Sequence, residues 1–181
     1  MKFDIGQLQK NYILEKVIKR KDLEMINGIF ETHINVLNFE ESSDFYKKLP
    51  GISPLYRDEG RKSTFFWVGG EGKGMLGIRE NYPSKNVQRQ HFAISVDLDD
   101  LKKTAIEVKK LGISISNFFE DDSGELYVFP FMPAVSFYFE DPNGHSVEYI
   151  SMLDDEPLPD KPIMKWSEWE KMNERLPRDI F

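Results

Sequence analysis

The 181-residue sequence contains no cysteine, which excludes disulfide bonds, thiolate metal ligands and a cysteine nucleophile. A metal ion bound by this chain must therefore be held by histidine, aspartate or glutamate. Histidine is itself scarce, because the chain has only His33, His91 and His145. These three side chains are the only imidazole nitrogens that the chain can offer to a metal ion.

The sequence also lacks an excess of positive charge and a long apolar run. Its formal net charge of −7 argues against a nucleic-acid partner, since a basic patch is the usual footprint of such binding. No uninterrupted apolar stretch approaches the roughly 18 residues that a membrane-spanning helix needs. The N-terminus has no basic and then apolar secretory signal. We therefore expect a soluble, cytoplasmic, globular protein with neither a membrane nor a nucleic-acid partner.

Three segments alternate apolar and polar residues as β-strands do. They are residues 31–37, 90–96 and 146–150. Because successive side chains of a strand leave from opposite faces, each segment has one face suited to a core and one that is more polar. The polar faces carry His33, His91 and Glu148. Two neutral imidazoles and a carboxylate suit Fe²⁺, Mn²⁺, Ni²⁺, Co²⁺ or Zn²⁺ and leave coordination positions open for water or substrate.

The order of the predicted elements repeats once along the chain. A strand at 29–37 precedes a helix that begins at Asn38 and strands near 53–57, 63–68 and 74–80; a strand at 90–96 precedes a helix near 98–111 and strands near 113–118, 135–140 and 146–152. The chain therefore reads as two β-α-β-β-β modules. An insertion at 119–132 has an acidic turn followed by prolines and aromatics. It predicts either a flap over a cavity or a packed surface loop.

These patterns predict a central domain with an extension at each end. The domain covers residues 29–153, with modules at 29–80 and 90–153, between a helical extension at 1–28 and a C-terminal extension at 154–181. The C-terminal extension contains a short predicted helix that carries Trp166, Trp169 and Met172 on one face. That face is expected to be buried, either on its own subunit or on a neighbour.

Several short motifs resemble a known family over about residues 29–153. The motifs are Thr32–Val36, Ser43–Tyr46, Met75–Ile78, His91–Val96 and Asp141–Glu148. Together they resemble the vicinal oxygen chelate superfamily, which contains glyoxalase I, fosfomycin-resistance enzymes, extradiol dioxygenases and bleomycin-resistance proteins. The resemblance implies an α+β fold in which two modules form a curved, open-barrel-like mixed sheet around a metal site, with extra N- and C-terminal helices. It also implies that His33, His91 and Glu148 bind a divalent metal ion and that the chain forms a homodimer.

Two positions separate the chain from particular members of that family. Glyoxalase I has a further glutamate ligand, which aligns with Gly77, and a glycine has no side chain to coordinate a metal. Extradiol dioxygenases use an additional histidine. The remaining histidine here, His145, lies in a predicted turn and is expected to be exposed. Neither glyoxalase I nor extradiol dioxygenase activity is therefore indicated directly.

The resemblance leaves more than one function open. The first hypothesis is a metal-dependent enzyme of the isomerase, lyase, transferase or ring-cleaving type, which acts on a small oxygenated molecule with Glu148 in the catalytic metal site. The candidate substrate-binding residues are Arg79, Tyr138 and Trp67, although a surface salt bridge or core packing would also explain them. The alternatives are a metal-free drug or metabolite-binding protein of the bleomycin-resistance type, and a dimerising module without activity.

Overall fold

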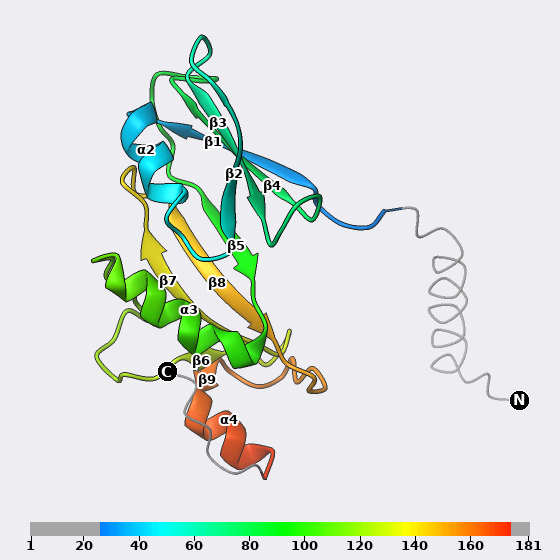
Figure 1. Ribbon diagram of the computed structural model, residues 1–181. Coiled ribbons are helices and arrows are strands. Elements are labelled where there is room, and N and C mark those ends of the chain that lie inside the picture. The colour runs from blue at the N-terminus through cyan, green and yellow to red at the C-terminus, as the bar shows by residue number, and fades with distance from the viewer. Residues whose placement is uncertain (1–25, 175–181) are drawn as a thin grey trace, which may run out of the picture. The chain divides into compact units, whose positions relative to one another are not determined.

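The computed structural model describes residues 26–174 (Figure 1). The chain divides into two compact units, Met1–Phe30 and Glu31–Phe181, and all the elements below belong to the second. The predicted N-terminal helix falls on residues outside the described part, so the predicted domain limits remain predictions. No helix within residues 26–174 is both long and apolar enough to cross a membrane.

The first module forms a four-stranded mixed sheet in the order β1-β4-β3-β2. Its elements are β1 (Glu31–Val36), α2 (Phe39–Tyr46), β2 (Ile52–Asp58), β3 (Ser63–Val68) and β4 (Met75–Glu80). Strands β1 and β4 are parallel and the other pairs are antiparallel. Helix α2 begins after Asn38, whose side-chain oxygen accepts a hydrogen bond from the Glu41 N–H at 3.2 Å, as its sequence predicts.

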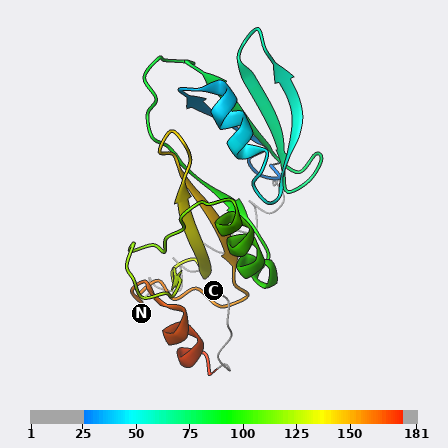
Figure 2. The same cartoon turned by 60° about the vertical axis from the view of Figure 1, so that its left-hand side comes forward.

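The second module forms a five-stranded mixed sheet in the order β5-β8-β7-β6-β9. Its elements are β5 (His91–Ser95), α3 (Leu98–Lys110), β6 (Tyr127–Val128), β7 (Ala134–Glu140), β8 (Ser146–Met152) and β9 (Met164–Lys165). Helix α2 lies against one face of the first sheet and α3 against one face of the second (Figures 1 and 2). Two mixed sheets that do not close into a barrel confirm the predicted α+β fold class.

The strand predicted at residues 113–118 is wrong. Only one isolated bridge forms there, between Ser116 and Tyr138, and β6 from the predicted insertion pairs with β7 instead. The Asn117 side chain explains the difference, because it donates hydrogen bonds to Asp121 Oδ1 at 2.7 Å and to the Glu125 carbonyl at 3.0 Å. Such local bonds from a side chain compete with a strand ladder.

The C-terminal helix forms as predicted and buries most of its aromatic face. Helix α4 (Trp166–Met172) places Trp166 and Trp169 in the hydrophobic core, and the Trp169 indole donates a hydrogen bond to Asp155 Oδ2 at 2.9 Å. Met172, at the end of the helix, is exposed on this subunit, so of the three predicted residues only the two tryptophans are buried by the chain itself. The aromatic face of the tail therefore packs on its own chain.

The turn between β7 and β8 joins the two modules. The Tyr46 hydroxyl of α2 donates a hydrogen bond to Asp141 Oδ2 at 2.8 Å, and the Leu37 N–H donates one to Asn143 Oδ1 at 2.8 Å. Burial and the neighbouring Asp141 carboxylate raise the pKa of the Tyr46 phenol, so it remains a neutral donor. Both modules also contribute to one hydrophobic core.

The prediction that His145 is an exposed turn residue is wrong. Its exposed fraction is 0%, and its ring lies between the two modules. The Nε2 atom is 2.8 Å from the Asn35 carbonyl, and Nδ1 accepts a hydrogen bond from the Gln90 N–H at 3.1 Å. A neutral ring with its proton on Nε2 satisfies both contacts. His145 therefore has a structural position away from the open faces of the sheets.

Candidate metal site

The structure brings His91 and Glu148 together on the polar face of the second sheet. His91 begins β5, and Glu148 lies on the neighbouring strand β8, opposite Ala93. His91 Nε2 and Glu148 Oε2 are 3.1 Å apart. The His91 side chain is 53% exposed, whereas that of Glu148 is only 6% exposed. An accessible imidazole thus sits beside a carboxylate whose surroundings fix its position.

Neighbouring side chains orient both groups. Ser146 Oγ is 3.2 Å from His91 Nδ1, which leaves Nε2 facing the carboxylate. The Tyr138 hydroxyl donates a hydrogen bond to Glu148 Oε1 at 2.8 Å and accepts one from Ser136 Oγ at 3.1 Å. Burial, together with the bond to Glu148, raises the pKa of the Tyr138 phenol. These contacts are typical of the outer-shell bonds that orient metal ligands.

The third candidate ligand, His33, lies on the polar face of the first sheet. Its Nε2 atom contacts Glu31 Oε1, and its ring meets the edge of Phe65 with 5.6 Å between ring centres. Gly77 of β4 lies directly opposite His33. A Cβ atom at Gly77 would be 2.8 Å from two atoms of the imidazole, so the ring fills the space that a side chain at this position would need.

His33 does not join His91 and Glu148 within the chain. Among residues 26–174, no three His, Asp or Glu side chains lie close enough together to hold a metal ion. A cavity of about 290 Å³ between β1 and β5 is lined by Thr32, Ile34 and His91, among others. Thr32 and Ile34 leave β1 on the side opposite His33. The β1 residues that line the cavity beside His91 therefore do not include His33.

Two of the predicted substrate-binding residues lie on the same face as His33. Arg79 is two residues beyond Gly77 on β4, and its guanidinium lies 3.9 Å from the ring centre of Tyr82. Within the described part of the chain, no carboxylate forms an ion pair with Arg79. Trp67 of β3 is partly buried opposite Met75 of β4. The first sheet thus presents an imidazole, a guanidinium and aromatic surface on one face.

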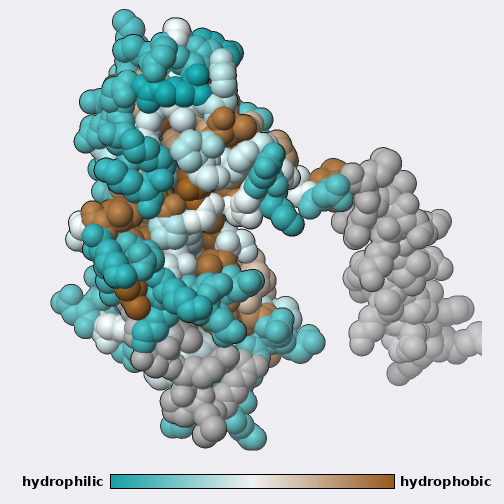
Figure 3. Space-filling view, viewed as in Figure 1, coloured by the Kyte–Doolittle hydropathy of each residue, from teal (hydrophilic) through white to brown (hydrophobic). Residues whose placement is uncertain are grey.

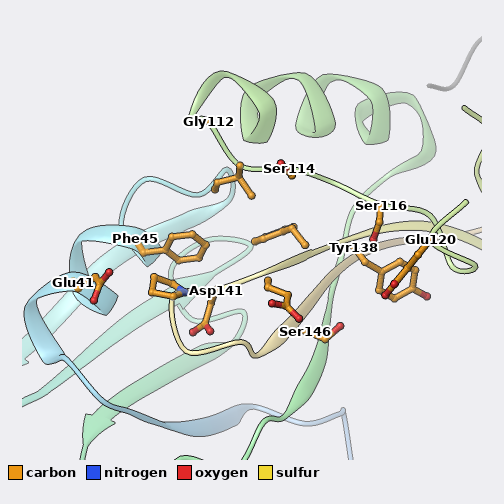
Figure 4. A pocket seen from close by; sticks show the side chains of 13 residues that line it. Glu41, Phe45, Gly112, Ser114, Ser116, Glu120, Tyr138, Asp141 and Ser146 are labelled. Carbon is orange, nitrogen blue, oxygen red and sulfur yellow. The ribbon is translucent and has the colours of Figure 1, made fainter. Parts of the chain in front are cut away.

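A larger cavity adjoins the oriented residues of the second sheet. It has a volume of about 680 Å³ and extends from α2 past the end of α3 to β7 (Figure 4). Tyr138 and Ser146 line it, and both also contact the His91 and Glu148 pair. Glu41, Glu120 and Glu140 make much of its remaining wall acidic. This cavity offers space beside the candidate site.

Three supporting residues are missing from the sequence-based prediction. They are Ser136, Ser146 and Glu31. The two serines alternate with Tyr138 and Glu148 along their strands, and Glu31 precedes His33 by two residues. Period-two alternation places each on the same face as a candidate, so that signal was available. Which candidate each of these three residues contacts depends on the cross-strand register, which only the structure gives.

The paired modules, with imidazole and carboxylate groups on their open faces, define a protein of the glyoxalase-like class. The family model described as "Glyoxalase/Bleomycin resistance protein/Dioxygenase superfamily" matches residues 28–149. The chain belongs to this superfamily.

Solved structures agree with this assignment. An integron cassette protein from the mobile metagenome of the Halifax Harbour sewage outfall is 34% identical, over 70% of this chain and 100% of its own, with a TM-score of 0.59. Lactoylglutathione lyase from Agrobacterium tumefaciens is 22% identical, over 71% of this chain and 96% of its own, with a TM-score of 0.54. The fosfomycin resistance protein FosX from Listeria monocytogenes, solved with Mn(II) and sulfate, is 18% identical, over 72% of this chain and 94% of its own, with a TM-score of 0.51. The last two show likeness of fold.

Proposed function

We propose that this protein is a metal-dependent enzyme that acts on a small oxygenated molecule. The observation that carries the proposal is the pairing of His91 with Glu148, each oriented by a neighbouring hydroxyl, on an accessible face of the second sheet. A surface ion pair needs no neighbouring groups to orient it. Here a hydroxyl orients each partner, as outer-shell groups orient metal ligands. In the proposal, His33 supplies the third metal ligand.

The donor set fits a divalent ion of the first transition series. Two imidazole nitrogens and a carboxylate oxygen suit Fe²⁺, Mn²⁺, Ni²⁺, Co²⁺ or Zn²⁺, and the Listeria relative with Mn(II) supports Mn²⁺ as one of these. When bound, the ion would supply Lewis-acid chemistry, which stabilises negative charge on a substrate oxygen. The protein's own groups hold the ligands in place: Tyr138 fixes the Glu148 carboxylate, and Ser146 fixes the His91 ring.

We further propose that a second copy of the chain completes the site. His33 and the His91 and Glu148 pair are separated within one subunit, so a homodimer must bring the first sheet of one copy to the second sheet of the other. We call His33 on the first sheet and the His91 and Glu148 pair on the second the two half-sites. Large apolar side chains beside both are exposed, among them Tyr56 (55%) near His33 and Met152 (55%) on the strand of Glu148. Hydrophobic side chains also reach the surface across the middle of the second unit on the face drawn in Figure 3. A partner that covers these faces would bury them.

Arg79 is the residue proposed to recognise the substrate's charge. Its guanidinium is stacked on Tyr82 and is not neutralised by a carboxylate of the described residues. A planar guanidinium in that state suits a carboxylate or phosphate group of a substrate. Trp67 and Tyr138 would then provide aromatic walls on the two half-sites.

The metal content of the purified protein tests the proposed function. We expect near-stoichiometric metal in protein purified without added metal or chelator, and its loss in Glu148→Ala and in His91→Ala, because each variant removes a donor. Elemental analysis provides the measurement, and far-UV circular dichroism checks that the variants are folded. A protein that stays metal-free after reconstitution with each of the five ions would contradict the proposal and favour the metal-free binding protein.

Tyr138→Phe is expected to weaken metal binding without unfolding the protein. The substitution removes the hydroxyl that holds Glu148 Oε1 but keeps the ring. Loss of an outer-shell partner costs about 10–100-fold in metal affinity. Competition with a chromogenic chelator measures this change, and Tyr127→Phe is a matched control because it removes a hydroxyl that donates to Asp121 instead of Glu148. Equal affinities for Tyr138→Phe and wild type would show that the hydroxyl does not position the carboxylate.

A further inference from the structure

Glu31 is a carboxylate on the candidate face that the predicted ligand set does not use. It begins β1, two residues before His33, and its Oε1 atom contacts His33 Nε2. Both side chains are partly exposed, 39% for Glu31 and 46% for His33. As a surface ion pair, this contact would contribute little to stability. The Glu31 carboxylate and the His33 imidazole are thus in contact, as the Glu148 carboxylate and the His91 imidazole are on the second sheet.

The registers of the two sheets show which residues of the modules correspond. In β8, the buried residues Val147 and Tyr149 flank Glu148. In β4, the buried residues Leu76 and Ile78 flank Gly77 in the same way. Gly77 is therefore the first-module counterpart of Glu148.

The same registers identify the counterpart of His91. Glu148 lies opposite Ala93, which is two residues after His91. Gly77 lies opposite His33, which is two residues after Glu31. The buried residues agree, because Ile34 of β1 and Ile94 of β5 then correspond. Glu31 thus occupies in the first module the place that His91 occupies in the second.

We propose that Glu31 is a metal ligand of the first module, beside His33. This inference rests on the proposed function. Gly77, the counterpart of Glu148, has no side chain, and the His33 ring fills the space above it, so the carboxylate that contacts His33 is that of Glu31. Glu31 and Glu148 together carry two negative charges, which balance a divalent cation. The resulting ligand set has two nitrogens and two carboxylates. Compared with a set richer in histidine, it favours harder ions such as Mn²⁺.

Glu31→Gln and Glu31→His, compared with Glu71→Gln, test this inference. Glu71 is an exposed loop residue, so Glu71→Gln matches the change in charge. We expect Glu31→Gln to weaken Mn²⁺ and Co²⁺ binding by at least about 100-fold, the upper end of the loss for an outer-shell partner. Glu31→His restores a donor of the type that His91 provides and should bind Co²⁺ within about 10-fold of wild type. The visible spectrum of the Co²⁺-loaded protein should change in Glu31→His, because one ligand changes from oxygen to nitrogen.

The outcomes separate this inference from the proposed function. Wild-type affinity and an unchanged Co²⁺ spectrum in Glu31→Gln would overturn the ligand role of Glu31, and metal loss in His91→Ala would still support the metal site. Equal losses in Glu31→Gln and Glu31→His would also overturn it, because a residue that only pairs with His33 gains nothing from the new imidazole. A wild-type protein that binds neither ion overturns both proposals.

Discussion

A heterodimer of two metal-free variants is expected to bind about one metal ion per dimer, half the content of a wild-type dimer with two shared sites. One subunit carries Glu31→Ala together with His33→Ala, and the other carries Glu148→Ala. If each site takes its donors from the first sheet of one copy and the second sheet of the other, the heterodimer has one complete site and one site without these donors. Each homodimer has two incomplete sites and should contain no metal.

Co-expression with two affinity tags and sequential purification isolates the heterodimer, and elemental analysis then measures its metal. The double variant removes both proposed metal ligands of the first sheet, so the result does not depend on which of Glu31 and His33 contributes more to metal binding. Sedimentation equilibrium of the same sample verifies the dimer. A metal-free heterodimer, beside wild-type protein that contains metal, would contradict a shared site, because sites built within single chains cannot be restored by mixing.

His145→Ala is expected to lower the free energy of unfolding by about 3 kcal/mol, because it removes a fully buried ring and both of its hydrogen bonds, whose partly buried partners would lose about 1–3 kcal/mol each. The partners are the carbonyl of Asn35, in β1 of the first module, and the N–H of Gln90, directly before β5 of the second module. The ring is fully buried, so the variant also leaves a cavity, which adds to the loss. Urea unfolding followed by circular dichroism measures the difference.

His33→Ala in metal-free protein is the matched control. Its side chain is partly exposed, so we expect a change within about 0.5 kcal/mol, as for most surface substitutions. Equal stability losses for the two histidine variants would contradict the structural role of His145. Metal content should respond in the opposite order, with a large loss in His33→Ala and little change in His145→Ala, provided that the latter is folded.

The strands that carry the candidate residues were predictable because alternation with a period of two is a local property. Ile34 and Val36 are buried and His33 is exposed, as the pattern in residues 31–37 predicts. The same reasoning placed Glu148 on the opposite face from Val147 and Tyr149. Helix α2 was similarly predictable, since its Asn38 cap is a local signal. These features follow from short-range sterics and the burial of apolar side chains.

Residues 113–118 and His145 show where local patterns fail. The apolar alternation near Ile113 predicts a strand, but the Asn117 side chain bonds to its own loop, and β6 takes the neighbouring position beside β7. His145 follows turn residues, yet the turn docks against the first module and buries the ring. The first outcome depends on side-chain bonds within the loop of Asn117, which the alternation of apolar residues does not contain. The second depends on Asn35, which is distant from His145 in the sequence.

By itself, the sequence determined which residues face the core, the two-module order and the identity of the imidazole and carboxylate groups, because these follow from periodicity and composition. Only the tertiary structure decided which of those groups meet. Cross-strand register joined His91 to Glu148 and placed Glu31 in the position that corresponds to His91. The same tertiary structure keeps His33 apart from His91 and Glu148 within one subunit, a separation that no local pattern could give.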